Sequence, residues 1–138
     1  MRLVLDTSVI VAAFRSPNGA SAEILRLVRK RKITMLVSIG LFLEYEAVLK
    51  RPDHLAVAGL AATDVDRILD VLAVHAERVD IFFLWRPKLR DADDDMVLEI
   101  AVNGNADAIV TFNIRDFAGT VQDFGIPALL PADVLRRL

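Results

Sequence analysis

Short apolar runs alternate with longer segments of helical periodicity along this chain, and that alternation constrains its fold more than any other feature. Strands are predicted at residues 2–5, 33–38, 80–85, 107–112 and 126–131. Helices are predicted at residues 8–14, 21–32, 41–50, 63–79 and 132–138, and another follows the acidic cluster at 91–95 and ends near Gly104. Because parallel strands need crossover connections that are usually helical, this order predicts an α/β fold: a three-layer α/β/α sandwich with a mostly parallel central sheet.

The composition fits one compact domain spanning residues 1–138. Hydrophobic residues make up 54% of the chain, enough for a buried core, and no apolar run is long enough to cross a membrane. The N-terminus has one Arg before a short run that meets Asp6, so we expect no signal peptide and a cytoplasmic protein. The absence of Cys excludes disulfides and thiolate metal sites. The net charge of −2 argues against wrapping of duplex DNA but is compatible with a local basic patch that contacts RNA.

Helix boundaries are predicted from capping residues and prolines. Ser21 is expected to cap the second helix, and Thr63 with Asp66 forms a predicted capping box. Pro52 is expected to end the helix before it, leaving His54 in a loop.

Acidic side chains gather at the predicted strand ends and helix starts. Asp6 interrupts the first apolar run, and Glu44 has only apolar neighbours three and four residues away on its helix. The other candidates are Asp91, Asp93, Asp94 and Asp95 before a helix, and Asn113 and Asp116 after the strand 107–112. Each has a plain structural explanation: helix capping for Asp6 and the cluster, a rim position for Glu44, and a loop turn for Asp116.

A parallel sheet would bring these loops together at one edge, beyond the carboxyl ends of the strands. Two carboxylates about 4 Å apart repel by roughly 4 kcal/mol at an effective dielectric near 20, so a group of them raises its own pKa values or recruits a cation. Oxygen ligands suit Mg²⁺ or Mn²⁺, and such sites commonly serve phosphodiester chemistry.

Four motifs resemble the PIN domain family, nearest to the toxin components of prokaryotic type II toxin–antitoxin systems, the VapC-like ribonucleases. The motifs are VLDTSVIVAAF at 4–14, EYEAVLKRP at 44–52, DADDDMVLEIA at 91–101 and ADAIVTFNIRDF at 106–117. Their order and approximate spacing match the family over nearly the whole chain.

The resemblance implies a metal-dependent ribonuclease with a small α/β/α fold. Its catalytic residues would be Asp6, Glu44, Asp94 and Asp116, with Asp95 as a further metal ligand. Which of Asp91, Asp94 and Asp95 binds the metal stays open.

Two further residues have roles implied by the resemblance. Ser8 would hydrogen-bond a ligand or a metal-bound water, and Asn113 stands where many PIN domains have Asp. Arg15, Arg90 and Arg115 flank the motif loops and are candidates for phosphate contact.

The resemblance also implies partners. They are Mg²⁺ (or Mn²⁺), an RNA substrate, a cognate antitoxin that covers the acidic cleft, and a second copy of the chain. The apolar helices that start at about Leu41 and Thr63 are the expected homodimer or higher homo-oligomer surface.

Other functions remain alternatives. Asn113 keeps open a catalytically weak or inactive PIN-like module that binds RNA or protein. A phosphoacceptor signalling domain would require a late Lys, whereas no Lys follows Lys88. A dinucleotide-binding fold would require a glycine-rich turn after the first strand, which this chain lacks.

Overall fold

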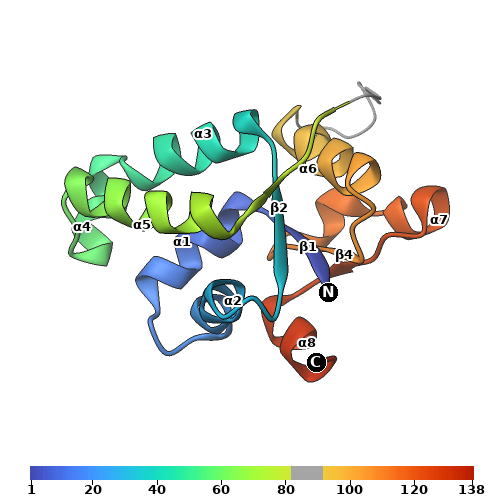
Figure 1. Ribbon diagram of the computed structural model, residues 1–138, viewed down its shortest axis with the longest axis horizontal. Coiled ribbons are helices and arrows are strands. Elements are labelled where there is room, and N and C mark those ends of the chain that lie inside the picture. Colours follow the sequence, from blue (N-terminus) through green and yellow to red (C-terminus); the bar gives the residue numbers. More distant parts are fainter. Residues whose placement is uncertain (82–91) are drawn as a thin grey trace.

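A five-stranded parallel sheet forms the centre of the protein (Figure 1). The computed structural model describes residues 1–81 and 92–138. The strand order is β3-β2-β1-β4-β5, and every pair is parallel. The strands are β1 (Arg2–Leu5), β2 (Thr34–Val37), β3 (Glu77–Arg78), β4 (Ala108–Val110) and β5 (Ala128–Leu129). The predicted fold class is confirmed, with a fully parallel sheet in the described part.

The central strand β1 fixes the register of its neighbours. Leu3 pairs with Met35 of β2, and Leu5 pairs with Val110 of β4. Leu3, Val4 and Leu5 are all fully buried. A run of apolar residues without alternation suits such a strand, because both faces of a parallel sheet are covered.

Helices cover both faces of this sheet. They are α1 (Thr7–Arg15), α2 (Ala20–Arg29), α3 (Ile39–Leu49), α4 (Pro52–Ala58), α5 (Ala62–His75), α6 (Ala92–Asn103), α7 (Thr120–Phe124) and α8 (Pro131–Arg136), with a 3₁₀ turn η1 (Ile114–Phe117). Helix α6 packs on β1, β2 and β4, whereas α2 packs against α1 and α8 on the opposite side (Figure 1). None of the helices in the described ranges is long and apolar enough to cross a membrane.

The third strand of the described residues lies before the strand predicted at 80–85. The edge strand β3 is Glu77–Arg78, which the sequence assigned to the end of a helix. Asp80 and Ile81 lie outside any strand, and residues 82–85 lie outside the described residues. Two charged, exposed residues suit an edge strand, but they carry no apolar signal that sequence analysis can detect.

Two predicted caps are wrong. Helix α2 begins after Gly19, which has extended backbone angles, so Ser21 lies inside the helix and is buried. The N-cap of helix α5 is Ala61, two residues before the expected Thr63, and the Asp64 carboxylate accepts the Ala61 backbone N–H at 2.9 Å. Asp66 instead forms an ion pair with another helix.

The loop predicted after α3 is also a helix. Pro52 is the first residue of α4, where its missing N–H costs nothing, and His54 lies within that helix. Helix α7 was not predicted at all.

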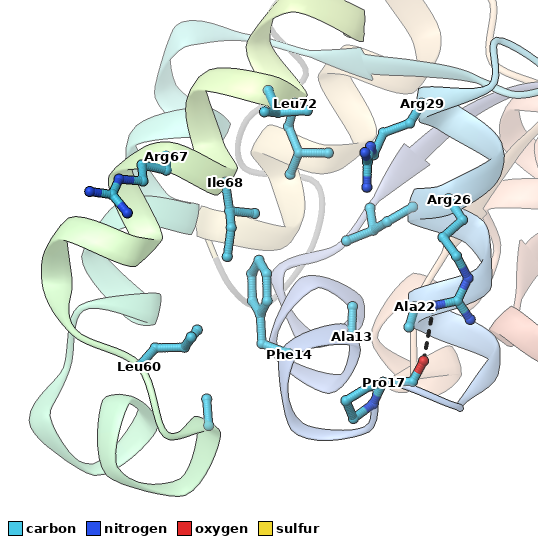
Figure 2. A pocket seen from close by; sticks show the side chains of 13 residues that line it. Ala13, Phe14, Pro17, Ala22, Arg26, Arg29, Leu60, Arg67, Ile68 and Leu72 are labelled. Atoms are coloured by element: carbon cyan, nitrogen blue, oxygen red, sulfur yellow. Dashed lines mark hydrogen bonds between the residues drawn. The ribbon is translucent and has the colours of Figure 1, made fainter.

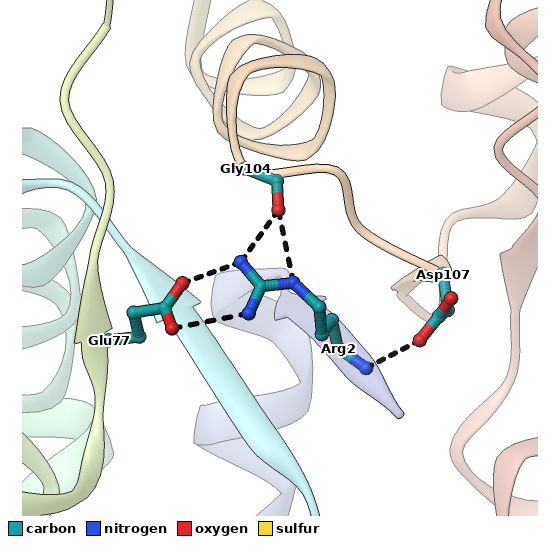
Figure 3. Close-up of polar contacts among 4 residues, drawn as sticks. All are labelled: Arg2, Glu77, Gly104 and Asp107. Carbon is teal, nitrogen blue, oxygen red and sulfur yellow. Dashed lines mark hydrogen bonds and ion pairs between the residues drawn. The ribbon is translucent and has the colours of Figure 1, made fainter.

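An arginine joins three elements at the amino-terminal edge of the sheet (Figure 3). The guanidinium of Arg2 donates to both carboxylate oxygens of Glu77, at 3.2 and 2.5 Å. It also donates twice to the Gly104 carbonyl after α6, at 3.2 and 2.8 Å. The Arg2 backbone N–H donates to the Asp107 carboxylate at 2.7 Å. One cation thus links the starts of β1 and β3 to the end of α6.

Candidate active site

Asp6 stands at the carboxyl end of β1, where the chain turns into α1. Its backbone N–H donates to the Val110 carbonyl at 2.9 Å, which continues the β1–β4 ladder by one residue. Its side chain makes no capping bond to α1. Instead, Oδ2 accepts the hydroxyls of Ser8 and Thr111, each at 2.8 Å. The carboxylate is 8% exposed, so its position is set by two neutral donors at a largely buried site.

Thr111 reaches Asp6 because of the strand register. Leu5 pairs with Val110, so the residues that follow them, Asp6 and Thr111, lie side by side. The fully buried Thr111 hydroxyl donates to Asp6 and accepts the Asn113 backbone N–H at 2.9 Å. Sequence analysis gave Thr111 no role, and the only signal was a hydroxyl at the end of an apolar strand.

Glu44 approaches the same strand end from α3. The Thr7 hydroxyl donates to its Oε2 at 2.7 Å, and Thr7 is the residue directly after Asp6. Ser38 fixes the start of α3, because its Oγ accepts the Leu41 backbone N–H at 3.1 Å. The structure therefore brings Glu44 and Asp6, 38 positions apart in the chain (44 less 6), to one end of the sheet.

Tyr45 couples α3 to β1 beside both carboxylates. Its hydroxyl donates to the Leu5 carbonyl, and the side chain is fully buried. Burial raises the pKa of Tyr45 well above its ordinary value, and the negative charges of Asp6 and Glu44 raise it further. The phenol therefore stays protonated and keeps donating. Both carboxylates are close enough to act electrostatically on one hydroxyl.

Helix α6 contributes acidic side chains to its packed face. Asp95 is 3% exposed and Asp94 is half-buried. Glu99, one turn further along, is 2% exposed, and sequence analysis did not single it out. Its signal was an acidic residue within an apolar helical run, four positions after Asp95. Asp91 lies outside the described residues.

Close packing holds α6 against α3. A Cβ atom on Gly40 of α3 would lie 3.0 Å from the Met96 sulfur of α6. The small residue therefore allows the first turns of the two helices to approach, which brings the helix carrying Asp95 next to the helix carrying Glu44.

The remaining predicted acidic residue lies in the turn after β4. Asp116 and Asn113 are both exposed, and the Asp116 backbone N–H donates to the Asn113 carbonyl at 3.0 Å. The hydrogen bonds that Asp6 makes within residues 1–81 and 92–138 do not include Asp116. Asp116 thus lies in the turn after β4, the strand that pairs with β1 beside Asp6. Its side chain is not one of the hydrogen-bond partners of Asp6 among the described residues.

The structure separates the predicted phosphate-binding arginines. Arg115 is exposed in η1, next to Asp116. Arg15 ends α1, about 12 Å of helix beyond Thr7, where its guanidinium lies 2.6 Å from His54 Nδ1. Arg90 lies outside the described residues. Of the two arginines within the described residues, Arg115 lies at the carboxyl edge of the sheet and Arg15 does not.

A separate pocket of about 520 Å³ lies between α1, α2 and the segment that includes α5 (Figure 2). Its walls are mainly apolar, including Phe14, Leu60 and Ile68, and its rim carries Arg26, Arg29 and Arg67. None of the lining residues is acidic. The pocket is therefore distinct from the Asp6 edge.

The chemistry of the donors at the Asp6 edge fits a hard cation. The candidate ligands are carboxylate oxygens, and the hydroxyls of Ser8 and Thr111 both donate to Oδ2 of Asp6, so neither occupies Oδ1. Within the described ranges, no three His, Asp or Glu side chains form a group able to hold a metal by themselves.

The family of this chain follows from its sequence and its fold together. A family model described as PIN domain matches residues 2–115, which include β1, α3, α6 and β4. The chain belongs to the PIN domain family. PIN domains are generally nucleases that use divalent metals.

A solved structure agrees with the PIN-like fold. The chain resembles one in the crystal structure of VapBC2 from Rickettsia felis bound to a DNA fragment from their promoter. The TM-score is 0.59 with 18% sequence identity, covering 93% of this PIN domain and 97% of the other chain. No curated protein matches the sequence.

Proposed function

We propose that this PIN domain is a metal-dependent endoribonuclease that hydrolyses RNA phosphodiester bonds. The observation that carries the proposal is the way Asp6 is held. Its buried carboxylate accepts hydroxyl groups, and no ion pair in the described part of the chain involves it. A buried carboxylate near a second carboxylate, with no cationic side chain to offset it, is favourable for binding a cation from solution.

The residues that would hold Mg²⁺ or Mn²⁺ are Asp6 and Glu44, with Asp94 or Asp95 and with Asp116. Two carboxylates are sufficient to start such a site, because Mg²⁺ commonly takes one or two and completes its shell with water and phosphate oxygens. The bound cation would lower the pKa of a water and neutralise charge that develops on the phosphate.

The chain's own residues would fix the orientation of these ligands. Ser8 and Thr111 hold the Asp6 carboxylate, and Thr7 holds Glu44. Hydrogen bonds of this kind to a ligand commonly change metal affinity or activity by about 10- to 100-fold. Asn113 would act through its backbone N–H, which donates to the Thr111 hydroxyl. Arg115 remains the candidate for phosphate contact, whereas Arg15 would act only on RNA that extends well beyond the site.

The proposal is tested by cleavage of a labelled single-stranded RNA in Mg²⁺ or Mn²⁺, with and without excess chelator. We expect cleavage only with the divalent ion, recovery when the ion is restored, and products with a 5′-phosphate and a 3′-hydroxyl. Asp6→Asn protein purified in parallel controls for contaminating nuclease. Undiminished cleavage in chelator, or equal cleavage by both proteins, would contradict the proposal.

We further propose that the protein is the toxin of a toxin–antitoxin pair. The support is the likeness in fold to a chain of VapBC2. The antitoxin would cover the acidic edge. Induced expression in a bacterial host should arrest growth for the wild-type protein and not for Asp6→Asn, and co-expression of the adjacent open reading frame should restore growth. Normal growth at high wild-type expression would count against the toxin role.

A second copy of the chain is the proposed partner of α3 and α5. Ile39 and Leu43 on α3 are 55% and 57% exposed, and Val74 on α5 is 71% exposed. A groove of about 230 Å³ lies between these helices, lined in part by Phe42 and Leu43. Sedimentation should give a dimer or larger for wild type and a monomer for Leu43→Asp. A wild-type monomer at micromolar concentration would refute this contact.

The alternative is a module that binds RNA or protein without cleaving it. The feature that favours it is Asn113, an amide at a position where many PIN domains have a carboxylate. RNA binding without any cleavage in either ion would select this alternative.

A further inference from the structure

One aromatic side chain is exposed beside the Asp6 network. Phe112 is 49% exposed, whereas the other aromatic side chains of residues 1–81 and 92–138 are buried or half-buried. It directly follows Thr111, whose hydroxyl donates to Asp6. Its neighbour Ile114 is 39% exposed, and Arg115 is exposed as well. An aromatic ring, an aliphatic side chain and a cation thus follow one another at this strand end.

Hydrogen bonds hold the backbone of Phe112 in place. Its N–H donates to the Ser8 hydroxyl at 3.3 Å, and Ser8 in turn donates to Asp6 at 2.8 Å. On either side, Thr111 is bound to Asp6 and the Asn113 N–H is bound to Thr111. The backbone at Phe112 is therefore tied to the same carboxylate that would hold the cation, which reduces the ordering cost of any ligand bound there.

We propose that Phe112 stacks on an unpaired base of the RNA and so positions the neighbouring phosphate at the Asp6 edge. This inference rests on the proposed nuclease function. Every base has a π face, and single strands expose it, whereas a duplex keeps its bases stacked inside. An exposed ring carried on a hydrogen-bonded backbone beside the proposed phosphodiester site suits such a base, and the nearby guanidinium of Arg115 suits the phosphate backbone. Phe112 is then a positioning residue that selects single-stranded RNA with little preference for sequence.

The test measures binding separately from cleavage. Affinity for a fluorescent single-stranded RNA is measured by anisotropy in the Asp6→Asn background, with Phe112→Ala, Phe112→Leu and Phe112→Tyr. We expect about 5- to 100-fold weaker binding for Ala and Leu and nearly unchanged binding for Tyr, because stacking requires the ring. A set of RNAs is then compared, each lacking one base at a different position of the bound segment. Removal of the stacked base should weaken binding to the parent protein but should not weaken binding to the Phe112→Ala variant further. Val57→Ala is the control, since this residue is 63% exposed on α4 and should leave binding unchanged.

The outcomes separate the two proposals. Wild-type cleavage with equal binding by Phe112→Ala would overturn the stacking role and leave the nuclease intact. Binding that depends on Phe112, in a wild-type protein that does not cleave, would support stacking and refute the nuclease. Retention of affinity by Phe112→Leu would overturn stacking in favour of a general apolar contact. Failure of both the wild type and the parent protein to bind RNA, with no wild-type cleavage, would overturn both proposals. A change in oligomeric state of Phe112→Ala, with RNA affinity unchanged, would overturn stacking and assign the ring to a protein contact.

Discussion

The two edges of the central sheet treat charge in opposite ways. At the amino-terminal edge, Arg2 meets Glu77 and the Gly104 carbonyl, so opposite charges and dipoles are matched within the protein (Figure 3). At the carboxyl-terminal edge, the Asp6 carboxylate accepts the hydroxyls of Ser8 and Thr111, which orient its negative charge without cancelling it, and Thr7 donates to Glu44 nearby.

The difference separates a structural contact from a candidate binding site. A matched ion pair leaves little for a ligand to gain, whereas an oriented carboxylate held only by neutral hydroxyls, as Asp6 is, gains from a cation that binds beside it. Helix α6 joins the two edges, because its first turns carry Asp94 and Asp95 and the residue after its end, Gly104, accepts from Arg2. Substitutions at the two edges should therefore change different properties of the same protein.

The largest expected effect is on activity at the carboxyl edge. Asp6→Asn should lower RNA cleavage by about 10³-fold or more, because a bound metal supplies several kcal/mol of stabilisation to the transition state. The amide can still accept the Ser8 and Thr111 hydroxyls, so the fold should be retained. Cleavage rates and the midpoint of thermal unfolding measure the two properties.

The control for Asp6→Asn is Asp70→Asn, which removes the same charge at an exposed position of α5. Its cleavage rate should match wild type. A comparable loss in both variants would mean that net charge, not the site, controls activity.

Thr111→Val should cost less activity but more stability. The change removes the donor to Asp6 and the acceptor for the Asn113 N–H at a fully buried position. We expect about 10- to 100-fold slower cleavage and a loss of about 1–3 kcal/mol in the free energy of unfolding. Cleavage assays and urea denaturation provide the two numbers.

Thr120→Val is the matched control for this hydroxyl. Thr120 is 2% exposed and donates to the Ile126 carbonyl at 2.9 Å, remote from Asp6 in the hydrogen-bond network. It should reduce stability by a similar amount and leave cleavage unchanged. If both threonine variants slow cleavage equally, the effect belongs to stability and not to the orientation of Asp6.

At the amino edge, Gly104→Ala should affect stability alone. A Cβ atom there would lie 2.9 Å from the Ile100 carbonyl oxygen and 2.9 Å from a Val79 methyl, so backbone must shift. We expect a loss of about 1–3 kcal/mol in the free energy of unfolding, with normal cleavage by the folded fraction. In Gly40→Ala the Cβ would meet only the flexible end of Met96, and stability should hold or rise. Urea denaturation should separate the two; equal losses would refute the steric account.

The smallest effect is the pH dependence of the Arg2–Glu77 pair. The hydrogen bond from Arg2, aided by its charge, lowers the pKa of Glu77 below its ordinary value. A lowered folded pKa means that the pair stabilises the fold above the ordinary pKa of about 4.3 and stops doing so as pH falls through the folded value. Because the pair is exposed, Glu77→Gln should cost less than about 1 kcal/mol at pH 7. Urea denaturation at pH 7, 5 and 4 should find this difference shrinking at the lowest pH, and a growing difference would contradict the assignment.

The sequence predicted that Asp6 and Glu44 lie at one end of the sheet, but it did not predict the contacts that hold them there. An acidic residue at the end of an apolar strand is a local signal, and a parallel sheet brings such strand ends together, which placed Asp6 and Glu44 correctly at one edge. The contacts of Thr7 and Thr111 depend on strand register and on helix rotation about its axis, neither of which appears in a single sequence. The charged two-residue strand β3 left no apolar pattern to detect. The N-terminus of α5 shows the same limit. Asp64 and Asp66 are equally suitable as the acidic residue of a capping box, but Asp66 forms a tertiary ion pair with Lys50, and Asp64 accepts the Ala61 N–H.

The most direct measurement is thermal unfolding of wild type and Asp6→Asn as Mg²⁺ or Mn²⁺ is increased, in the absence of RNA. A cation held at the carboxyl edge should raise the wild-type midpoint steadily, by a stabilisation of about 2.7 kcal/mol when its concentration is about 100 times Kd. Asp6→Asn should show almost no rise, while Glu77→Gln at the opposite edge should respond as wild type does. An equal rise in wild type and Asp6→Asn, or no rise in either, would contradict the claim that Asp6 helps to form a cation site.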